Sequence, residues 1–133
     1  MTKIVLIVLF VIATGLTVFY FFNKPANVGN DIMILNETNF DTTIAEGVTI
    51  VDFYADWCGP CRMLSPVMDE LAKELEGVTV GKVNVDESQN IAAKFGISAI
   101  PAVILFKDGT EMKRFVGIQP KATFVTEAKK LTE

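Results

Sequence analysis

Two cysteines at the junction of an apolar strand and a helix constrain this chain more than any other feature of its sequence. Residues 48–55 form an apolar, β-branched run that predicts a buried strand. Cys58-Gly59-Pro60-Cys61 comes shortly after this run. The next residues predict a helix, because apolar side chains recur at helical spacing at Leu64, Val67, Met68, Leu71 and Leu75. A thiol at such a junction is favoured as a thiolate, since a helix N-terminus offers unpaired N–H groups and the positive end of the helix dipole.

The cysteine pair has three chemical interpretations: a redox couple, a structural disulfide and a zinc site. A structural disulfide would close a loop of four residues, worth about 2 kcal/mol on the loop-entropy model. A domain of this size builds a sufficient core without it. A closed zinc site needs four ligands, whereas the chain has two cysteines and no histidine. We therefore favour reversible dithiol–disulfide exchange, and we expect no metal and no bound cofactor.

The charge of the chain is divided unevenly along its length. Residues 1–30 carry a balance of +2, whereas residues 31–133 hold 10 Lys and Arg against 16 Asp and Glu, a balance of −6. A globular part this acidic is a poor binder of nucleic acid. The absence of histidine also excludes Cys-His and Ser-His catalysis.

Residues 4–22 form an uncharged run of 19 residues in which only Thr14, Gly15 and Thr17 interrupt the apolar side chains. As a helix about 28 Å long, this run would match the hydrocarbon thickness of a bilayer, so we predict a transmembrane anchor over residues 1–22. A signal peptide cleaved near residues 13–15 is the alternative, but it would leave an exposed apolar tail on the domain. A buried core helix is disfavoured because the run lacks a polar face.

Residues 23–30, which are rich in Asn, Pro and Gly, predict a linker, and residues 31–133 predict one domain. Strands are predicted at residues 32–35, 48–55, 78–85, 101–106 and 111–116. Helices are predicted at residues 39–46, 59–76, 88–95 and from Pro120 onward, with Asn39 and Ser88 as capping residues. Asp108-Gly109 predicts a hairpin turn between the last two strands. This alternation indicates an α/β fold whose mainly parallel sheet is covered by helices on both faces.

The cysteines belong to a longer motif, Trp57-Cys58-Gly59-Pro60-Cys61. Asp52 lies six residues before Cys58, and Ile100-Pro101 follows about forty residues after it. Together these residues resemble the thioredoxin family. A Cys-x-x-Cys motif beside a βαβ pattern is itself the established signature of thioredoxin-like proteins. The resemblance covers residues 31–133. It implies the thioredoxin fold, with a central mixed, mainly parallel sheet flanked by helices, and a redox-active disulfide between Cys58 and Cys61. Gly-Pro between the cysteines resembles the reducing members, whereas strongly oxidising members usually carry a histidine there.

Position gives the two thiols different expected roles. Cys58 begins the helix, where its thiolate is stabilised, so we expect it to attack the client disulfide. Cys61 lies one turn further into the helix and is expected to be shielded. We expect it to resolve the mixed disulfide. Asp52 interrupts an apolar strand, where burial raises the pKa of a carboxyl group, unless a strand end exposes it. The resemblance implies that Asp52 accepts the proton of Cys61 through water and that Lys82 tunes Asp52. A surface lysine on an edge strand is the alternative for Lys82.

The resemblance also implies a client-binding groove beside the cysteines. The Ile100–Pro101 peptide bond is expected to be cis, with the backbone of Ile100 pairing with an extended client; an ordinary proline at the start of a strand is the alternative. Pro66 is expected to kink the active-site helix. Ser98-Ala99 and Ala102 stand where many thioredoxins have Arg-Gly and Thr, so client preference is expected to differ. The other expected groove residues are Trp57, Gly59, Pro60, Ala99 and Gly117.

We therefore predict a membrane-anchored protein-disulfide reductase or dithiol electron carrier that acts as a monomer. Its expected partners are disulfide-containing client proteins, a thioredoxin reductase or membrane dithiol relay as electron donor, and the membrane itself through residues 4–22. An N-terminal hydrophobic run usually directs the export of the chain after it, so the domain is expected to be extracytoplasmic, with a cytoplasmic domain as the alternative. An oxidase or isomerase of secreted proteins and a non-enzymatic assembly module at the membrane are the alternative functions.

Overall fold

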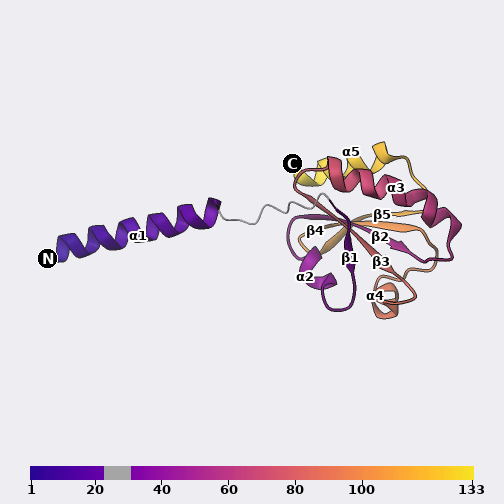
Figure 1. Ribbon diagram of the computed structural model, residues 1–133, viewed down its shortest axis with the longest axis horizontal. Helices are drawn as coiled ribbons and strands as arrows, with labels where there is room; N and C mark the ends of the chain where they lie inside the picture. The colour runs from indigo at the N-terminus through magenta and orange to yellow at the C-terminus, as the bar shows by residue number, and fades with distance from the viewer. Residues whose placement is uncertain (23–30) are drawn as a thin grey trace.

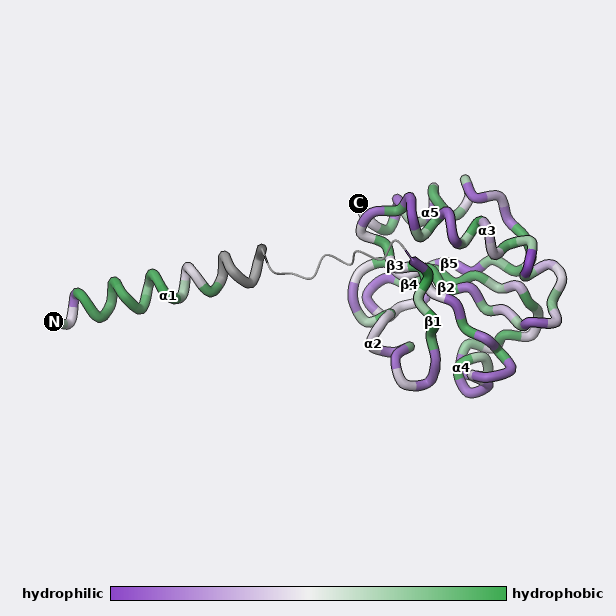
Figure 2. Tube along the Cα trace, viewed as in Figure 1, coloured by the Kyte–Doolittle hydropathy of each residue, from purple (hydrophilic) through white to green (hydrophobic). Residues whose placement is uncertain are grey.

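A computed structural model describes the backbone of residues 1–22 and 31–133 and the side chains of residues 1–16 and 31–133 (Figure 1). The predicted linker, residues 23–30, lies outside the described residues. The N-terminal run forms one helix, α1, over Thr2–Phe22, and its described part is mostly hydrophobic (Figure 2). The large apolar side chains of this part are exposed. Within the part of the chain that the structure describes, no helix is both long enough and apolar enough to cross a membrane.

The domain is built on a sheet of five strands in the order β1-β3-β2-β4-β5. The strands are β1 Met33–Leu35, β2 Val48–Tyr54, β3 Val78–Asn84, β4 Ala102–Lys107 and β5 Thr110–Val116. Both β1 and β2 pair with β3 in parallel, whereas β2–β4 and β4–β5 are antiparallel. The predicted mixed sheet with an antiparallel final hairpin is therefore confirmed, whereas the predicted majority of parallel pairings is wrong, because two of the four pairings are antiparallel.

The direction of β4 produces this difference. Residues 85–101 connect β3 to β4 and contain one short helix, α4 Gln89–Lys94. A connection of this length can lead to a parallel or to an antiparallel strand, so the alternation of helices and strands does not determine the direction. Here the chain re-enters the sheet at the end where β3 leaves it, so β4 runs antiparallel to β2.

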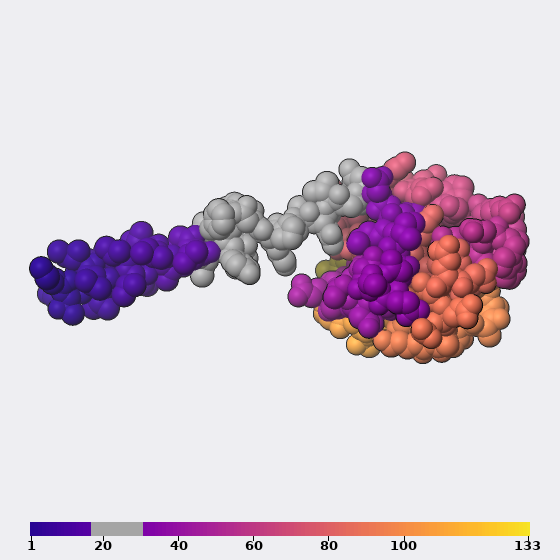
Figure 3. All heavy atoms as spheres, turned by 60° about the horizontal axis from the view of Figure 1, so that its bottom comes forward, coloured from indigo at the N-terminus to yellow at the C-terminus, as the bar shows by residue number. Residues whose placement is uncertain are grey.

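Two apolar clusters, one on each face of the sheet, form the core. On one face, α3 Gly59–Glu74 and α5 Lys121–Thr132 cover the strands (Figure 1). On the other face lie α2 Phe40–Ile44 and α4, side by side in Figure 3 and joined by an ion pair of 3.0 Å between Lys94 Nζ and Asp41 Oδ1. The first cluster is centred on Leu64, Met68, Leu71, Phe124 and Ala128, and the second contains the rings of Phe40, Phe53, Phe95 and Phe106.

The predicted order of strands and helices in the domain is confirmed, with element ends shifted by at most two residues. Asn39 and Ser88 do precede α2 and α4, but neither side chain caps its helix. The Asn39 side chain instead accepts a hydrogen bond from the Asn36 backbone N–H and donates one to the carbonyl oxygen of Ile34, at 2.8 and 3.0 Å. It therefore holds the chain between β1 and α2 rather than the helix itself.

The predicted hairpin turn at Asp108 and Gly109 is confirmed, since both residues have positive φ angles, 49° and 83°. This turn is also bound to the turn between α2 and β2. The Asp108 carboxylate accepts a hydrogen bond from the Gly47 N–H at 2.8 Å, and the Gly109 N–H donates to the carbonyl oxygen of Ile44 at 2.8 Å. Two turns that are sixty-one residues apart thus close the same end of the sheet.

Gly81 in β3 allows the first strand to lie close against the sheet. A Cβ atom at this position would lie 2.6 Å from Leu35 Cδ1 and 3.4 Å from the carbonyl oxygen of Met33. Because real Cβ atoms essentially never approach another heavy atom so closely, a larger residue here would force the buried Leu35 side chain of β1 to move. No local sequence pattern indicates this requirement.

Candidate active site

A disulfide bond joins Cys58 and Cys61 at the first turn of α3, with their Cα atoms 5.3 Å apart. Cys58 is the N-cap residue, with φ −85° and ψ 109°, and its Sγ accepts a hydrogen bond from the Cys61 backbone N–H at 3.3 Å. Gly59 and Pro60 fill the first turn, where the missing N–H of proline leaves no donor unpaired. The helix N-terminus therefore directs a backbone donor at the first sulfur of the motif.

Both cysteines are buried in the disulfide form, with exposed fractions of 4% for Cys58 and 3% for Cys61. The expected difference in shielding between the two is thus not seen in this oxidation state. Their positions in the helix still differ, because Cys58 caps it and Cys61 lies three residues inside. The pair packs with Ala55, Tyr54, Val85 and Ile100.

Asp52 lies buried near the middle of β2, with an exposed fraction of 4%. The alternative of an exposed strand end is therefore wrong. Burial raises the pKa of Asp52 from 3.8 to about 7, while the positive charge of Lys82 acts in the opposite direction. Among the described residues, the Asp52 Oδ1 atom has no hydrogen-bond partner. This carboxyl group can therefore change its protonation state near neutral pH.

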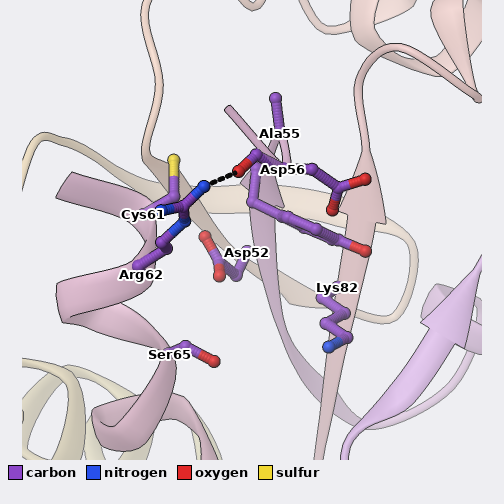
Figure 4. Close-up of a pocket in the computed structure, with 8 residues that line it drawn as sticks. Asp52, Ala55, Asp56, Cys61, Arg62, Ser65 and Lys82 are labelled. Atoms are coloured by element: carbon purple, nitrogen blue, oxygen red, sulfur yellow. Dashed lines mark hydrogen bonds between the residues drawn. The ribbon is translucent and has the colours of Figure 1, made fainter. Parts of the chain in front are cut away.

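Asp52 and Cys61 line the same cavity, which has a volume of about 160 Å³ (Figure 4). A space of this size holds water molecules when polar groups surround it. The cavity thus offers a route for a proton between the Cys61 sulfur and the Asp52 carboxylate. Its lining consists of Asp52, Tyr54, Ala55, Asp56, Cys61, Arg62, Ser65 and Lys82.

Lys82 reaches this cavity from the neighbouring strand, because it pairs in register with Asp52 across β2 and β3. Its Nζ atom lies 5.3 Å from the centre of the Tyr54 ring, which places the ammonium group over an aromatic face. The strand that carries it is not at the edge of the sheet. The alternative of a surface lysine on an edge strand is therefore wrong.

Arg62 and Ser65 line the cavity from α3, and the sequence reasoning identified neither. An Nη2 donor of Arg62 bonds to the carbonyl oxygen of Asp56 at 2.8 Å, so that the guanidinium group lies across one side of the cavity (Figure 4). Ser65 lies four residues after Cys61 on the same helix. That spacing places both on one helix face, and it is the signal by which Ser65 could have been found.

The Ile100–Pro101 peptide bond is cis, as the family resemblance implied. The Pro101 carbonyl oxygen accepts a hydrogen bond of 2.8 Å from the N–H of Gly117, a residue with φ 88°. Trp57 is 69% exposed, and its Nε1–H donates to Asp86 Oδ2 at 2.8 Å. Sequence reasoning did not identify Asp86, because its partnership with Trp57 spans two loops.

The three positions that depart from the usual thioredoxin residues differ in exposure. Ser98 and Ala99 are exposed just before the cis peptide bond. Ala102 is 1% exposed and begins β4. Solvent therefore reaches the first two side chains but not the third.

No group of three or more His, Cys, Asp or Glu side chains could hold a metal ion in the described ranges 1–16 and 31–133. The chemistry that the arrangement itself supports is reversible cleavage of the disulfide. One sulfur lies at a helix N-terminus, and the residue that carries the other lines a cavity with a carboxyl group whose pKa is about 7.

Comparison with known proteins agrees with this geometry. The profile of the family described as Thioredoxin matches residues 31–130. A thioredoxin from Chlamydia pneumoniae is 51% identical over 90 residues, 68% of this chain and 88% of that protein. The chloroplastic thioredoxin M5 of Oryza sativa is 44% identical over 104 residues, 76% of this chain and 60% of that protein. The structure of a mutant thioredoxin from Halobacterium salinarum superimposes with a TM-score of 0.74 and 36% identity, covering 79% of this chain and 94% of that one. The chain therefore belongs to the thioredoxin family of protein thiol–disulfide oxidoreductases.

Proposed function

We propose that the protein reduces client disulfides through a Cys58 nucleophile, a Cys61 resolving thiol and an Asp52 proton acceptor, while an N-terminal helix holds it at a membrane. The observation that carries the catalytic part is the Cys58–Cys61 disulfide at the start of α3, above a cavity that contains Asp52. Lys82 tunes Asp52, since its charge lowers the pKa that burial raises.

The reaction proceeds in two exchanges. The Cys58 thiolate attacks one sulfur of the client disulfide, forms a mixed disulfide and releases the other client sulfur as a thiolate. Cys61 then gives its proton to Asp52 through water in the cavity, and its thiolate attacks the Cys58 sulfur. The mixed disulfide breaks, the second client thiolate leaves, and both client thiolates take up protons. Two electrons pass to the client, and the protein retains the Cys58–Cys61 disulfide.

The cis peptide bond at Ile100–Pro101 and the surfaces beside it form the proposed client groove. An extended client segment pairs with the Ile100 backbone, next to the exposed ring of Trp57 and the turn at Gly117. Gly59, Pro60 and Ala99 are exposed and complete this surface. Ser98 and Ala99 are the positions at which client preference departs from that of other thioredoxins.

A trapping experiment tests this assignment. In a Cys61→Ser variant the mixed disulfide on Cys58 cannot be resolved, so client proteins should remain attached and be released by a reductant. A Cys58→Ser variant is the matched control and should trap none. If the control retained the biological function, the non-enzymatic assembly role would replace the one proposed. A reduction potential in the range of strong oxidants would instead favour the oxidase or isomerase.

After each turnover the disulfide must be reduced again by a donor of two electrons. We propose a thioredoxin reductase or a dithiol relay in the membrane for this step. The two donors are distinguished by reconstituting client reduction with each of them. Consumption of NADPH reports the reaction with the reductase. The protein is proposed to act as a monomer, and light scattering of the detergent-solubilised chain measures this.

Membrane attachment is proposed from residues 4–22, which carry no charge, and from the exposed apolar side chains of α1 between Ile4 and Leu16. Apolar surface of this extent is normally covered by lipid or protein. The full chain should remain with membranes after extraction at alkaline pH, and a chain that begins at Asp31 should be released. Release of the full chain would contradict the anchor.

The domain is proposed to lie outside the cytoplasm, because an N-terminal hydrophobic run usually directs the export of the chain after it. The two cysteines of the motif are compatible with an oxidising compartment, since no other thiol exists to pair wrongly. Alkaline phosphatase fused after Glu133 should be active, because this enzyme matures only where disulfides form. An inactive fusion together with an active β-galactosidase fusion at the same site would place the domain in the cytoplasm.

A further inference from the structure

Ser65 is a polar residue of the active-site cavity to which the proposed reaction gives no role. It lies in α3, one helical turn after Cys61, and its half-buried side chain lines the same space as Asp52 and Lys82. In Figure 4 its hydroxyl group is turned from the helix toward the strands that carry Asp52 and Lys82. The Asp52 carboxylate lies between the helix turns that carry Cys61 and Ser65 in this view.

The charged groups around Asp52 already have other partners. The Arg62 guanidinium donates to the carbonyl oxygen of Asp56, beyond β2, and the Lys82 ammonium lies over the Tyr54 ring. Among the described residues no group bonds to Asp52 Oδ1. A serine hydroxyl can donate one hydrogen bond and accept another, so it suits a site that must hold water beside a carboxylate.

We propose that Ser65 is a positioning residue for Asp52, and that its hydroxyl group holds, from α3, the water through which the buried carboxylate is solvated. This inference rests on the proposed role of Asp52 as the proton acceptor of Cys61. Ser65 does not touch the reacting sulfur atoms in this scheme. It acts through the carboxylate, by supplying a donor to its charged form.

The consequence concerns the pH at which Asp52 becomes available as a base. A hydrogen-bond donor beside the carboxylate favours its charged form. Loss of the Ser65 hydroxyl group should therefore raise the pKa of Asp52 above about 7. A rise of about half a unit would reduce the ionised fraction at pH 7, and with it the rate of client reduction, roughly twofold. The other titratable and charged groups that line the cavity with Asp52, which are Lys82, Arg62, Asp56 and Tyr54, stay unchanged in this comparison.

The test compares Ser65→Ala with Ser65→Thr, which restores a hydroxyl group at the same position. The carboxyl carbon of Asp52 is titrated by NMR in the oxidised protein, where the cysteines do not titrate, and the rate of insulin reduction is measured across the pH range around neutrality. We expect Ser65→Ala to shift both the NMR midpoint and the rate profile to higher pH, and Ser65→Thr to return them toward the parent values. Unchanged midpoints in Ser65→Ala would overturn the inference.

A double-variant cycle separates this role from a structural one. In an Asp52→Asn background, Ser65→Ala should leave the rate unchanged, because the group through which Ser65 acts is gone. An equal loss of rate in both backgrounds would show that Ser65 supports α3 in general and would refute the inference. If Asp52→Asn alone reduced insulin at the parent rate, the proposed role of Asp52 would fail first, and the NMR midpoint would still report whether Ser65 acts on the carboxylate.

Discussion

The buried carboxyl group of Asp52 makes the stability of the fold depend on pH in a way that one substitution should remove. Its pKa is about 7 in the folded protein, against 3.8 as the ordinary value, because burial penalises the charged form. Well below pH 3.8 the group is neutral in both the folded and unfolded states and costs nothing. Between pH 3.8 and about 7 it ionises freely only in the unfolded chain, so the free energy of unfolding decreases as the pH rises.

The size of this effect depends on the two pKa values. The interval between 3.8 and about 7 corresponds to about 4 kcal/mol, since each pKa unit is worth about 1.4 kcal/mol. Asp52→Asn keeps the shape of the side chain and removes the ionisation. We therefore expect the variant to be more stable than the parent by up to about 4 kcal/mol at pH 8 and nearly equal to it at pH 4.

Guanidinium unfolding of the oxidised protein at pH 4, 6 and 8 measures this difference. Asp69→Asn is the matched control, because Asp69 is exposed on α3, and it should follow the pH dependence of the parent. The Asp52 variant should also reduce client disulfides more slowly at pH 7, by roughly tenfold, since Cys61 loses its proton acceptor. A stability difference that does not change between pH 4 and 8 would refute the reasoning, because the folded protein would then accommodate the charge without penalty.

The geometry of the domain makes three further outcomes testable. In the reduced protein, iodoacetamide should modify Cys58 well before Cys61 near pH 7, because Cys58 caps the helix; equal rates in a mass-spectrometric time course would contradict the assigned roles. Lys82→Gln should raise the pKa of Asp52 further, since it removes the charge that lowers it, and an NMR titration that shows no upward shift would exclude this coupling. Gly81→Ala should destabilise the domain by about 1–3 kcal/mol in guanidinium unfolding, because the new Cβ would lie 2.6 Å from a leucine side chain of β1. Unchanged stability would mean that β1 accommodates the added methyl group without cost.

Local patterns predicted the elements of this fold but not every relation between them. The apolar run before Cys58 and the helical spacing after it correctly located β2 and α3, because both signals are contained in neighbouring residues. The direction of β4 is not contained in the alternation of strands and helices, so the majority of parallel pairings was wrongly predicted. Asn39 stands at the predicted cap position, but its side chain forms hydrogen bonds to residues that precede it in the chain and not to the helix. The residue type alone does not reveal this.

In the active site, too, local patterns predicted single residues but not the pairs that they form. Cys58, Cys61 and Asp52 were identified from motif and burial arguments, since a carboxylate within an apolar strand is unusual by itself. The pairing of Asp52 with Lys82 requires the register between β2 and β3, which no local pattern contains. Ser65 was missed although it lies one helical turn from Cys61. A serine in a helix is common, and only the structure shows that this one lines the cavity with Asp52.

The hydrogen bonds between the turn at Asp108 and Gly109 and the turn at Gly47 have a consequence for the cooperativity of the domain. A hairpin at the edge of a sheet would ordinarily open by itself, as a unit of low local stability. Here the β4–β5 turn cannot separate without also releasing the corner that leads into β2, the strand that carries Asp52 and ends just before the cysteine motif. Opening of the hairpin is therefore coupled to opening of the strand that precedes the active site, and partial unfolding at this end of the sheet is less favourable than it would be for an untethered hairpin.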